Sequence, residues 1–209
     1  MNLQVAVRES FANHGITPFK VKRIEETKNG RYLYIENLPE NLPAEKWLPL
    51  FDASVPERTA DTYLYIGACT IVSAAVAAAL KCDVMKVVLP PHDHIFKVYA
   101  DEKVAISDLK PEDVDALYHA DHLVVTKMID GKPHVLDLTG AQFQWDASIL
   151  NRWVPVDRYL AMTRSTATAT MSPYAYMAKT NLTDAERDHQ ACMWNMLSDL
   201  RNVKHVEGI

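Results

Sequence analysis

The pattern of hydrophobic and polar positions predicts a chain of helices and short strands. Residues 3–14 carry apolar side chains at helical spacing and are followed by Gly15, which predicts a short N-terminal helix. Residues 19–37 form two runs of alternating character on either side of Asn29-Gly30. Because Asn-Gly is the strongest short signal for a tight turn between strands, these runs predict a β-hairpin.

The middle of the chain predicts a buried helix followed by strands. Residues 67–81 are rich in Ala and apolar on every side of a helix, which indicates a central helix packed all round. Four short runs rich in Val, Ile and aromatic residues then predict antiparallel strands. The runs cover residues 83–89, 94–100, 121–129 and 132–138. The turn residues Asp130-Gly131 join the last two runs as a hairpin.

Three further elements complete the expected secondary structure. Pro at the first position of Pro111–Ala120 favours a helix there. Residues 152–160 predict another strand, and the Ser, Thr and Ala residues of 164–173 predict a surface loop. Near the end, a T-x-x-E capping box predicts a helix that runs from Thr183 to Arg201.

One apolar run has the length of a short membrane span. Residues 63–80 contain no charged side chain over 18 positions. Its Ala, Gly, Ser and Thr content and the lack of a second span favour a buried helix instead, so we expect no membrane partner. The first ten residues have acidic and basic side chains but no apolar core, unlike a secretory signal. We expect one domain over residues 1–209, with a core at about 60–145 and the N-terminal helix and hairpin and the C-terminal helix as additions.

Composition and charge narrow the classes of partner. The 209 residues are 48% hydrophobic and 23% charged, as in ordinary globular proteins. The 22 basic and 27 acidic side chains give a net charge of −5 and form no basic block, which argues against nucleic acid as a partner. Three cysteines without metal-site spacing favour a reduced, cytoplasmic protein over a disulfide scaffold.

Cys69 stands where a thiol can become a nucleophile. It lies at the expected start of the central helix, where the helix dipole and unpaired N–H groups favour the thiolate. Gly67 lets the backbone turn into the helix and leaves room for a substrate. Backbone N–H groups at this end can also bind an oxyanion. By position, Cys82 at the end of the helix and Cys192 within the last helix are expected to be structural.

A histidine and an aspartate follow on adjacent arms of one hairpin. With the turn at Asp130-Gly131, paired residues have numbers that sum to about 261, so His122 lies opposite position 139. Asp137 is then a diagonal neighbour of His122 on the same face. His122 suits a general base for Cys69, and the Asp137 carboxylate suits the role of orienting its imidazole.

At these residues the sequence resembles the transglutaminase-like branch of the papain-like Cys-His-Asp enzymes. The matching segments are Gly67-Ala68-Cys69, Asp121-His122-Leu123-Val124-Val125, Asp137-Leu138-Thr139 and Gln142-Phe143. The resemblance covers about residues 60–145. It implies an α+β fold with a central buried helix packed on an antiparallel β-sheet, and a catalytic triad of Cys69, His122 and Asp137.

A weaker resemblance links the His122 segment to arylamine N-acetyltransferases of the same superfamily. Their Arg-Gly-Gly before the cysteine is Tyr65-Ile66-Gly67 here, and Leu138-Thr139-Gly140-Ala141 replaces their glycine-rich segment after the aspartate. Tyr63 also stands where papain-type enzymes carry an oxyanion glutamine. Tyr63, Tyr65 and Trp47 are therefore the candidates for a side-chain oxyanion donor.

The expected function is thiol-dependent acyl transfer without a cofactor or metal. The substrate is a small molecule or peptide with an amide or thioester carbonyl, and the second nucleophile selects hydrolysis, deamidation, transamidation or ring formation. Gln142-Phe143-Gln144-Trp145 either line the cleft or simply pack. The sequence leaves a non-catalytic binding or effector module open as the alternative.

A metal site is the third hypothesis for the function of this chain. His92 and His94 form an H-x-H pair on one side of an expected strand, with His119 and His122 downstream. The position where a metal site of this kind would carry an acidic ligand is Val98-Tyr99. We therefore expect a polar loop entering a strand rather than a metal site.

Overall fold

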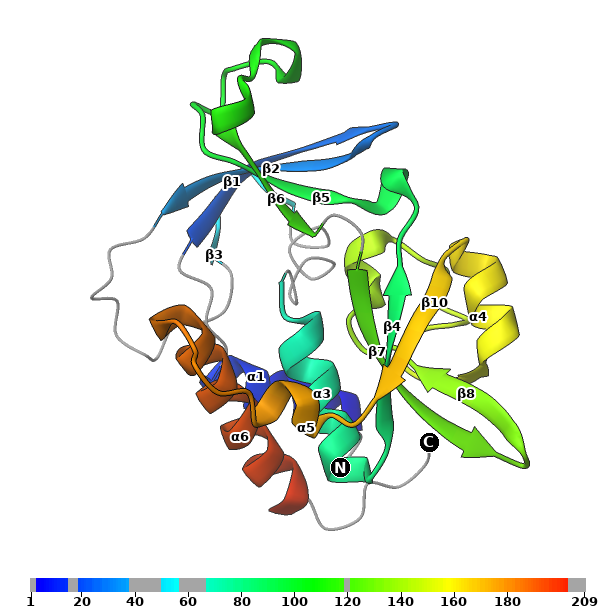
Figure 1. Ribbon diagram of the computed structural model, residues 1–209. Helices are drawn as coiled ribbons and strands as arrows, with labels where there is room; N and C mark the ends of the chain where they lie inside the picture. The colour runs from blue at the N-terminus through cyan, green and yellow to red at the C-terminus, as the bar shows by residue number, and fades with distance from the viewer. Residues whose placement is uncertain (1–2, 15–18, 38–49, 57–66, 119–120, 203–209) are drawn as a thin grey trace.

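The computed structural model describes residues 3–14, 19–37, 50–56, 67–118 and 121–202. They form an α+β fold with helices and two five-stranded sheets (Figure 1). We call the sheet with the order β3-β1-β2-β5-β6 the hairpin sheet, and the sheet with the order β10-β4-β7-β8-β9 the main sheet.

The bounds of the elements are as follows. The hairpin sheet contains β1 (Phe19–Thr27), β2 (Gly30–Asn37), β3 (Leu50–Phe51), β5 (Ile95–Val98) and β6 (Val114–Tyr118). The main sheet contains β4 (Asp83–Val88), β7 (Asp121–Ile129), β8 (Lys132–Leu136), β9 (Trp153–Pro155) and β10 (Thr166–Met171). The helices are α1 (Leu3–His14), α3 (Cys69–Leu80), α4 (Val156–Thr163), α5 (Tyr174–Met177) and α6 (Asp184–Asn202).

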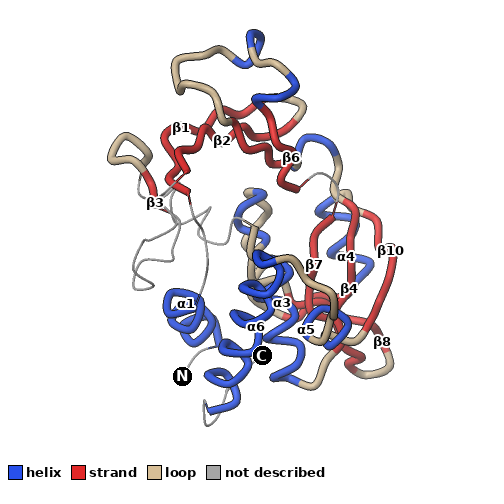
Figure 2. Tube along the Cα trace, turned by 60° about the vertical axis from the view of Figure 1, so that its left-hand side comes forward, coloured by secondary structure: helices blue, strands red, loops and turns tan. Residues whose placement is uncertain are grey.

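Helix α3 is the buried centre of the fold. It packs against β4 and β7 of the main sheet and against α1, α5 and α6. Figure 2 shows these helices gathered together, with the hairpin sheet at the opposite end of the molecule. The Ala residues of α3 let neighbouring elements approach closely, and every position from Ile71 to Ala78 is buried. The expected central helix on an antiparallel sheet is confirmed, since β10–β4, β4–β7, β7–β8 and β8–β9 of the main sheet all pair antiparallel.

The main sheet is covered on both faces. Successive side chains of a strand point to opposite faces, and here both sets are apolar. Val84 and Val125 pack in one core with α3, whereas Met85 and Val124 pack in a second core. The second core also includes Phe19, Val21, Leu33 and Ile95 of the hairpin sheet. One core therefore lies between the two sheets. The other lies between the opposite face of the main sheet and the helices packed around α3.

Several local predictions are confirmed. The N-terminal helix covers Leu3–His14, and β1 and β2 form the expected hairpin. The C-terminal helix begins with the capping box, in which the Thr183 amide donates to Glu186 Oε2 at 2.9 Å and the Glu186 amide donates to Thr183 Oγ1 at 3.3 Å.

The helix predicted at Pro111–Ala120 is wrong. Pro111–Asp113 form a single 3-10 turn, in which Asp113 Oδ2 accepts the Lys110 amide at 2.9 Å. The chain then continues as strand β6, which pairs with β5, and residues 119–120 lie outside the described part. Proline at a helix start fits one turn as well as a long helix, and the following Val, Leu and Tyr favour a strand.

The predictions for 152–160 and 164–173 are also corrected. Only Trp153–Pro155 form a strand, and α4 begins at Val156. The expected surface loop is strand β10, which pairs with β4 along the sheet edge. Its residues Thr166–Thr170 are all exposed, so no hydrophobic alternation marks the strand. The β-branched threonines were the remaining signal.

The run at 94–100 forms a strand in a different sheet from the other three. After β4, Pro90 and the 3-10 turn Pro91–Asp93 redirect the chain. Strand β5 then pairs parallel with β2 and antiparallel with β6. The antiparallel arrangement predicted for all four runs therefore holds for three of them.

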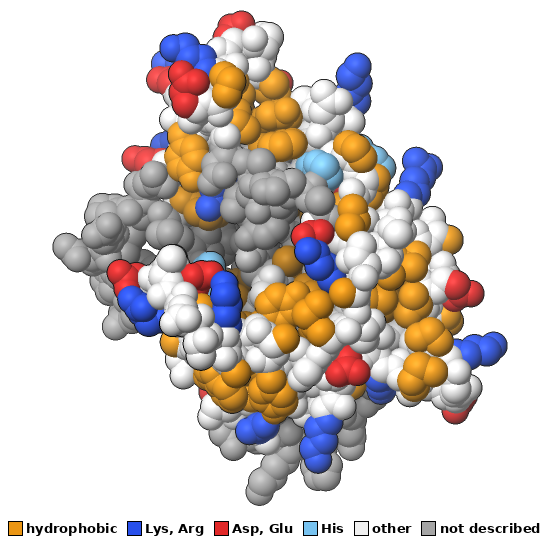
Figure 3. All heavy atoms as spheres, in the orientation of Figure 1, with side chains coloured by type: hydrophobic (Ala, Val, Ile, Leu, Met, Phe, Trp, Pro, Cys, Tyr) orange, Lys and Arg blue, Asp and Glu red, His pale blue; other side chains and the backbone are white. Residues whose placement is uncertain are grey.

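The face seen in Figure 3 carries hydrophobic side chains over α5 and α6. Tyr174 and Trp194 are each 42% exposed there, and their ring centroids are 6.2 Å apart. Within the described ranges, no helix combines the length and the apolar character needed to cross a membrane.

Candidate active site

Cys69 is the first residue of α3. Gly67 has φ 78°, a left-handed conformation that a side chain disfavours, and the chain turns there into the helix. Ala68 is the N-cap residue and offers no side-chain acceptor to the first helical N–H groups. The Cys69 side chain thus lies at the positive end of the helix dipole, and the residue is 4% exposed.

His122 and Asp137 are positioned by the β7–β8 hairpin. Asp130 and Gly131 form its two-residue turn with φ 48° and 75°. Ile129 pairs with Lys132, and the register continues to Val125 opposite Leu136. These numbers sum to 261, as the sequence predicts. Asp137 follows directly after β8, and His122 lies near the start of β7, opposite Val87 of β4.

The Asp137 carboxylate is held by four donors. Its Oδ2 lies 3.0 Å from His122 Nε2 and accepts the Tyr159 hydroxyl at 2.8 Å. Its Oδ1 accepts the amides of Thr139 at 3.0 Å and Gly140 at 2.8 Å. A Cβ at position 140 would lie 2.3 Å from Asp137 Oδ2, so this close approach requires glycine. The carboxylate is therefore fixed with one oxygen toward the imidazole.

Cys69 completes a buried chain of three ionisable side chains. Asp137 and His122 have fully buried side chains, and the thiol interacts with the imidazole. The second ring nitrogen, Nδ1, is buried and has no partner in hydrogen-bond geometry within the described residues. The structure thus brings together the three residues singled out in the sequence, with one imidazole nitrogen on the carboxylate and the thiol interacting with the same ring.

The charges of Cys69, His122 and Asp137 stabilise one another. Burial disfavours the imidazolium, but Asp137 and then Cys69 outweigh it and raise the pKa of His122 from 6.5 to about 10. Burial likewise opposes the thiolate, yet the attraction of His122 lowers the pKa of Cys69. The pKa of Asp137 is lowered because His122, Tyr159 and the Thr139 amide outweigh the effect of burial. The arrangement thus favours the thiolate, the imidazolium and the carboxylate over their neutral forms.

Aromatic rings surround the imidazole. The ring centroids of Phe143 and Trp145 lie 4.9 and 5.6 Å from that of His122, both edge to face. Trp145 also packs against Tyr159 at 5.7 Å. Phe143 and Trp145 therefore contact the candidate base, whereas buried Gln142 donates to the Thr139 carbonyl at 3.0 Å.

Two residues at this site were not singled out in the sequence. Tyr159 lies in a segment that was predicted as a strand, and no local motif links it to Asp137, 22 positions away. Asp93, which lies between the two histidines of the H-x-H pair, accepts the Trp145 indole N–H at 3.0 Å. Both contacts depend on tertiary structure, so the sequence carries no pattern that would have revealed them.

A further group lies beside the thiol. Lys86 of β4 forms an ion pair with Asp121, the residue before His122. The phenol of Tyr176 on α5 interacts with Lys86, Asp121 and Cys69 and is half-buried. A charged pair and a phenol thus border the side of the site where β4, β7 and α5 meet.

The histidines of the metal hypothesis do not converge. His92 is exposed, with Nε2 3.5 Å from Asp93 Oδ2, and His94 Nε2 lies 3.4 Å from the Leu89 carbonyl. His119 lies outside the described residues. In the part of the chain that is described, no three His, Cys, Asp or Glu side chains are arranged to hold a metal ion.

The other two cysteines lie in surroundings that differ from those of Cys69. Cys82 is half-buried and Cys192 is buried in the core with α3. Burial raises the pKa of both thiols, that of Cys192 to about 12. The oxyanion candidates Tyr63, Tyr65 and Trp47 lie outside the described residues.

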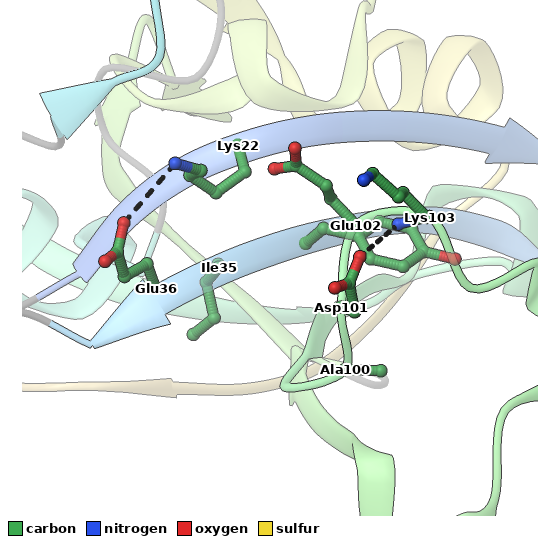
Figure 4. Close-up of a pocket in the computed structure, with 8 residues that line it drawn as sticks. Lys22, Ile35, Glu36, Ala100, Asp101, Glu102 and Lys103 are labelled. Carbon is green, nitrogen blue, oxygen red and sulfur yellow. Dashed lines mark hydrogen bonds and ion pairs between the residues drawn. The ribbon is translucent and has the colours of Figure 1, made fainter.

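A hollow of about 450 Å³ lies on the hairpin sheet, next to the loop at 100–103 (Figure 4). Its lining is mostly charged, and Lys22 is already paired with Glu36 at 3.5 Å and with Asp52 at 3.4 Å. Ligand pockets are usually apolar with a few polar groups, and neither Cys69 nor His122 lines this hollow.

Comparison with protein-family models, with curated proteins and with solved structures found no match for this chain.

Proposed function

We propose that the protein is a thiol-dependent acyl-transfer enzyme with Cys69 as nucleophile, His122 as acid and base, and Asp137 as the residue that orients His122. The observation that supports it most is the buried chain of interactions from Cys69 through His122 to Asp137. Burying three ionisable groups is costly unless they pair, and functional sites are where such shifted groups concentrate.

The arrangement supports a two-step reaction. The Cys69 thiolate attacks the carbonyl carbon of an amide or thioester, and the His122 imidazolium gives its proton to the leaving nitrogen or sulfur. An acyl-enzyme thioester remains. A second nucleophile then gives its proton to His122 and attacks the thioester, which releases the product and restores the thiolate. The N–H groups at the start of α3, which the side chain of the N-cap residue does not bind, suit the oxyanion that forms in each step.

The substrate class is a small molecule or peptide with an amide or thioester carbonyl. Water as second nucleophile gives hydrolysis or deamidation, an amine gives transamidation, and a carbanion gives ring closure. Each of these uses the same acyl-enzyme on Cys69.

The fold proposed for this activity is the papain-like, transglutaminase-like one. Its support is the chain order of a helix that begins with the cysteine, a strand with the histidine and a following strand that ends just before the aspartate. The packing of α3 on an antiparallel sheet agrees with this proposal.

Thiol reactivity tests the proposal, because the chain carries its own controls. Iodoacetamide is applied at pH 6, and alkylation at each cysteine is followed by peptide mass spectrometry. Cys69 should react at least tenfold faster than Cys82 and Cys192, whose pKa values are raised. Cys69→Ser should abolish the fast reaction, and His122→Gln should move it to higher pH. Equal rates at all three cysteines would reject the enzyme and favour a non-catalytic binding module.

Acyl donors provide the second arm of the test. The protein is exposed to a set of amides and thioesters, and the intact mass is measured for an adduct. A stable acyl adduct on Cys69 that is absent in Cys69→Ser identifies the donor class. The same experiment with added amines distinguishes transfer from hydrolysis.

A further inference from the structure

Asp93 is a buried carboxylate outside the triad. It closes the 3-10 turn Pro91–Asp93, which carries the chain from β4 of the main sheet to β5 of the hairpin sheet. It is 2% exposed, although Asp is rarely buried unless it has partners. The neighbouring His92 is exposed and His94 is half-buried. The buried member of the His92-Asp93-His94 motif is therefore the aspartate.

The two oxygens of Asp93 contact different elements. Oδ2 accepts the Trp145 indole N–H at 3.0 Å. Oδ1 lies 3.6 Å from Nη1 of Arg31, a residue of β2 in the hairpin sheet. Arg31 also donates to the Phe143 carbonyl at 3.1 Å. The segment that carries Phe143 and Trp145 is thus tied to the hairpin sheet through Arg31 and Asp93.

Trp145 lies between this tie and the candidate base. Its nitrogen is bound by Asp93, and its ring packs against His122, Phe143 and Tyr159. An indole in this place excludes water from the imidazole. Because charges attract more strongly where water is excluded, the His122–Asp137 pair depends on how firmly the ring is held.

We propose that Asp93 is a positioning residue that holds Trp145 against His122, with Arg31 of the hairpin sheet compensating its charge. The inference rests on the proposed function, because it assigns Asp93 a role in tuning the same site. Arg31 and the exposed His92 both face the Asp93 carboxylate, and Arg31 also pairs with Glu26. Because Arg31 offsets the charge of Asp93, Asp93 acts on His122 through the hydrogen bond to Trp145 and not through its own field. The hairpin sheet thereby takes part in setting the reactivity of Cys69.

The test compares the pH midpoint of Cys69 alkylation in four variants. Asp93→Ala frees the indole and should raise the midpoint by about half to one pH unit, because a wetter site favours the thiolate less. Trp145→Ala removes the ring and should raise it by about one unit or more. The double variant should match Trp145→Ala alone. Asp93→Asn keeps an oxygen that accepts the indole N–H, so its midpoint should stay near that of the unchanged protein.

The outcomes distinguish a positioning role from other roles. Additive shifts in the double variant, or equal shifts in Asp93→Asn and Asp93→Ala, would show that the charge acts directly and would overturn the proposal. Unchanged midpoints with a lower melting temperature would show a structural role only, and would also overturn it. Trp153→Ala is the control, because Trp153 packs on Lys127 away from His122 and should leave the midpoint unchanged.

Two additions keep the test decisive. If Asp93→Ala does not fold, Trp145→Phe removes the indole N–H but keeps a ring, and its midpoint should rise less than that of Trp145→Ala; no rise would overturn the proposal. The titration of the His122 ring is also followed by NMR in each variant. This readout needs no reactive thiol, so failure of the proposed function and failure of the Asp93 role give different results.

Discussion

The molecule contains two His–Asp pairs with the same separation and different surroundings. His122 Nε2 and Asp137 Oδ2 are 3.0 Å apart, and so are His14 Nε2 and Asp199 Oδ2, which join α1 to α6. The side chains of the first pair are fully buried, whereas those of His14 and Asp199 are 28% and 42% exposed. A short distance alone therefore does not distinguish a candidate catalytic pair from a contact between two helices.

The partners of the two carboxylates explain the difference. Asp199 accepts hydrogen bonds from the Ser10 hydroxyl and His14, and water reaches it. Asp137 is dry and receives two backbone amides and the Tyr159 hydroxyl besides His122. Water screens a charge pair, so the buried pair interacts more strongly and shifts the protonation of both partners. Ser10 also binds the aspartate rather than the imidazole, which differs from the order of a nucleophile, a base and an orienting acid.

The largest predicted effect comes from breaking the buried pair. Asp137→Ala leaves the imidazole without its partner and two amides without an acceptor, so we expect a loss of about 3–5 kcal/mol in unfolding free energy. Cys69 alkylation at pH 7 should fall by about 100-fold or more, since the imidazolium that stabilises the thiolate is lost. Urea denaturation and alkylation rates measure both. A variant as reactive as the unchanged protein would contradict the role of Asp137.

The hydroxyl of Tyr159 offers a smaller change with a matched control. Tyr159→Phe removes one of the four donors that fix the Asp137 carboxylate, so the carboxylate is held less firmly against His122 and the His122 pKa falls. We expect a stability loss of about 1–2 kcal/mol and an upward shift of the Cys69 alkylation midpoint by about half a pH unit.

Tyr34→Phe is the control for that change. Tyr34 of the hairpin sheet is also fully buried, and its hydroxyl donates to the Val104 carbonyl at 2.8 Å. Its loss should lower stability by a similar amount and leave the midpoint unchanged. A midpoint shift in both variants would mean that the alkylation rate follows stability rather than the charge of Asp137.

The stability of the protein against pH should reveal the coupling of Cys69 to His122. Unfolding lowers the pKa of His122 from about 10 to 6.5, and raises that of Cys69 to 9.0. Wherever between pH 6.5 and 9 the folded Cys69 is already a thiolate, the folded pair holds one proton, on His122, and the unfolded pair also holds one, on Cys69. Equal proton counts give no slope there, and the contribution of this pair to stability decreases above pH 9, where the unfolded thiol ionises while His122 in the folded protein keeps its proton.

Cys69→Ala removes the thiol, so that of the two groups only His122 still titrates. The raised pKa of His122 then stabilises the fold fully below pH 6.5, and this contribution is lost as the pH rises toward the folded value. Stability should therefore fall by up to about 1.4 kcal/mol per pH unit from pH 6.5 upward. Urea denaturation between pH 6 and 9 measures the slope. Identical pH profiles for this variant and the unchanged protein would exclude the coupling.

The features that the sequence predicted correctly depend on nearby residues. The turn at Asp130-Gly131 sets the register of β7 and β8, and this register places His122 near Asp137. Tyr159 and Asp93 reach the site only through tertiary contacts. Arg31 pairs with Ile95 across 64 positions, so the parallel order of the hairpin sheet has no local signal. The exposed edge strand β10 lacks the alternation that would have identified it.

The smallest predicted effect comes from the exposed pair. Asp199→Asn keeps acceptors for Ser10 and His14 but removes the charge, and exposed ion pairs contribute about 0.2–1 kcal/mol. Stability should fall by less than about 1 kcal/mol in low salt, and the difference should disappear in 1 M salt, where exposed charges are screened. Cys69 alkylation should not change. Denaturation at both salt concentrations checks this. A difference that persists in high salt would mean that Asp199 is as well protected as Asp137, and burial would then no longer explain the contrast between the two pairs.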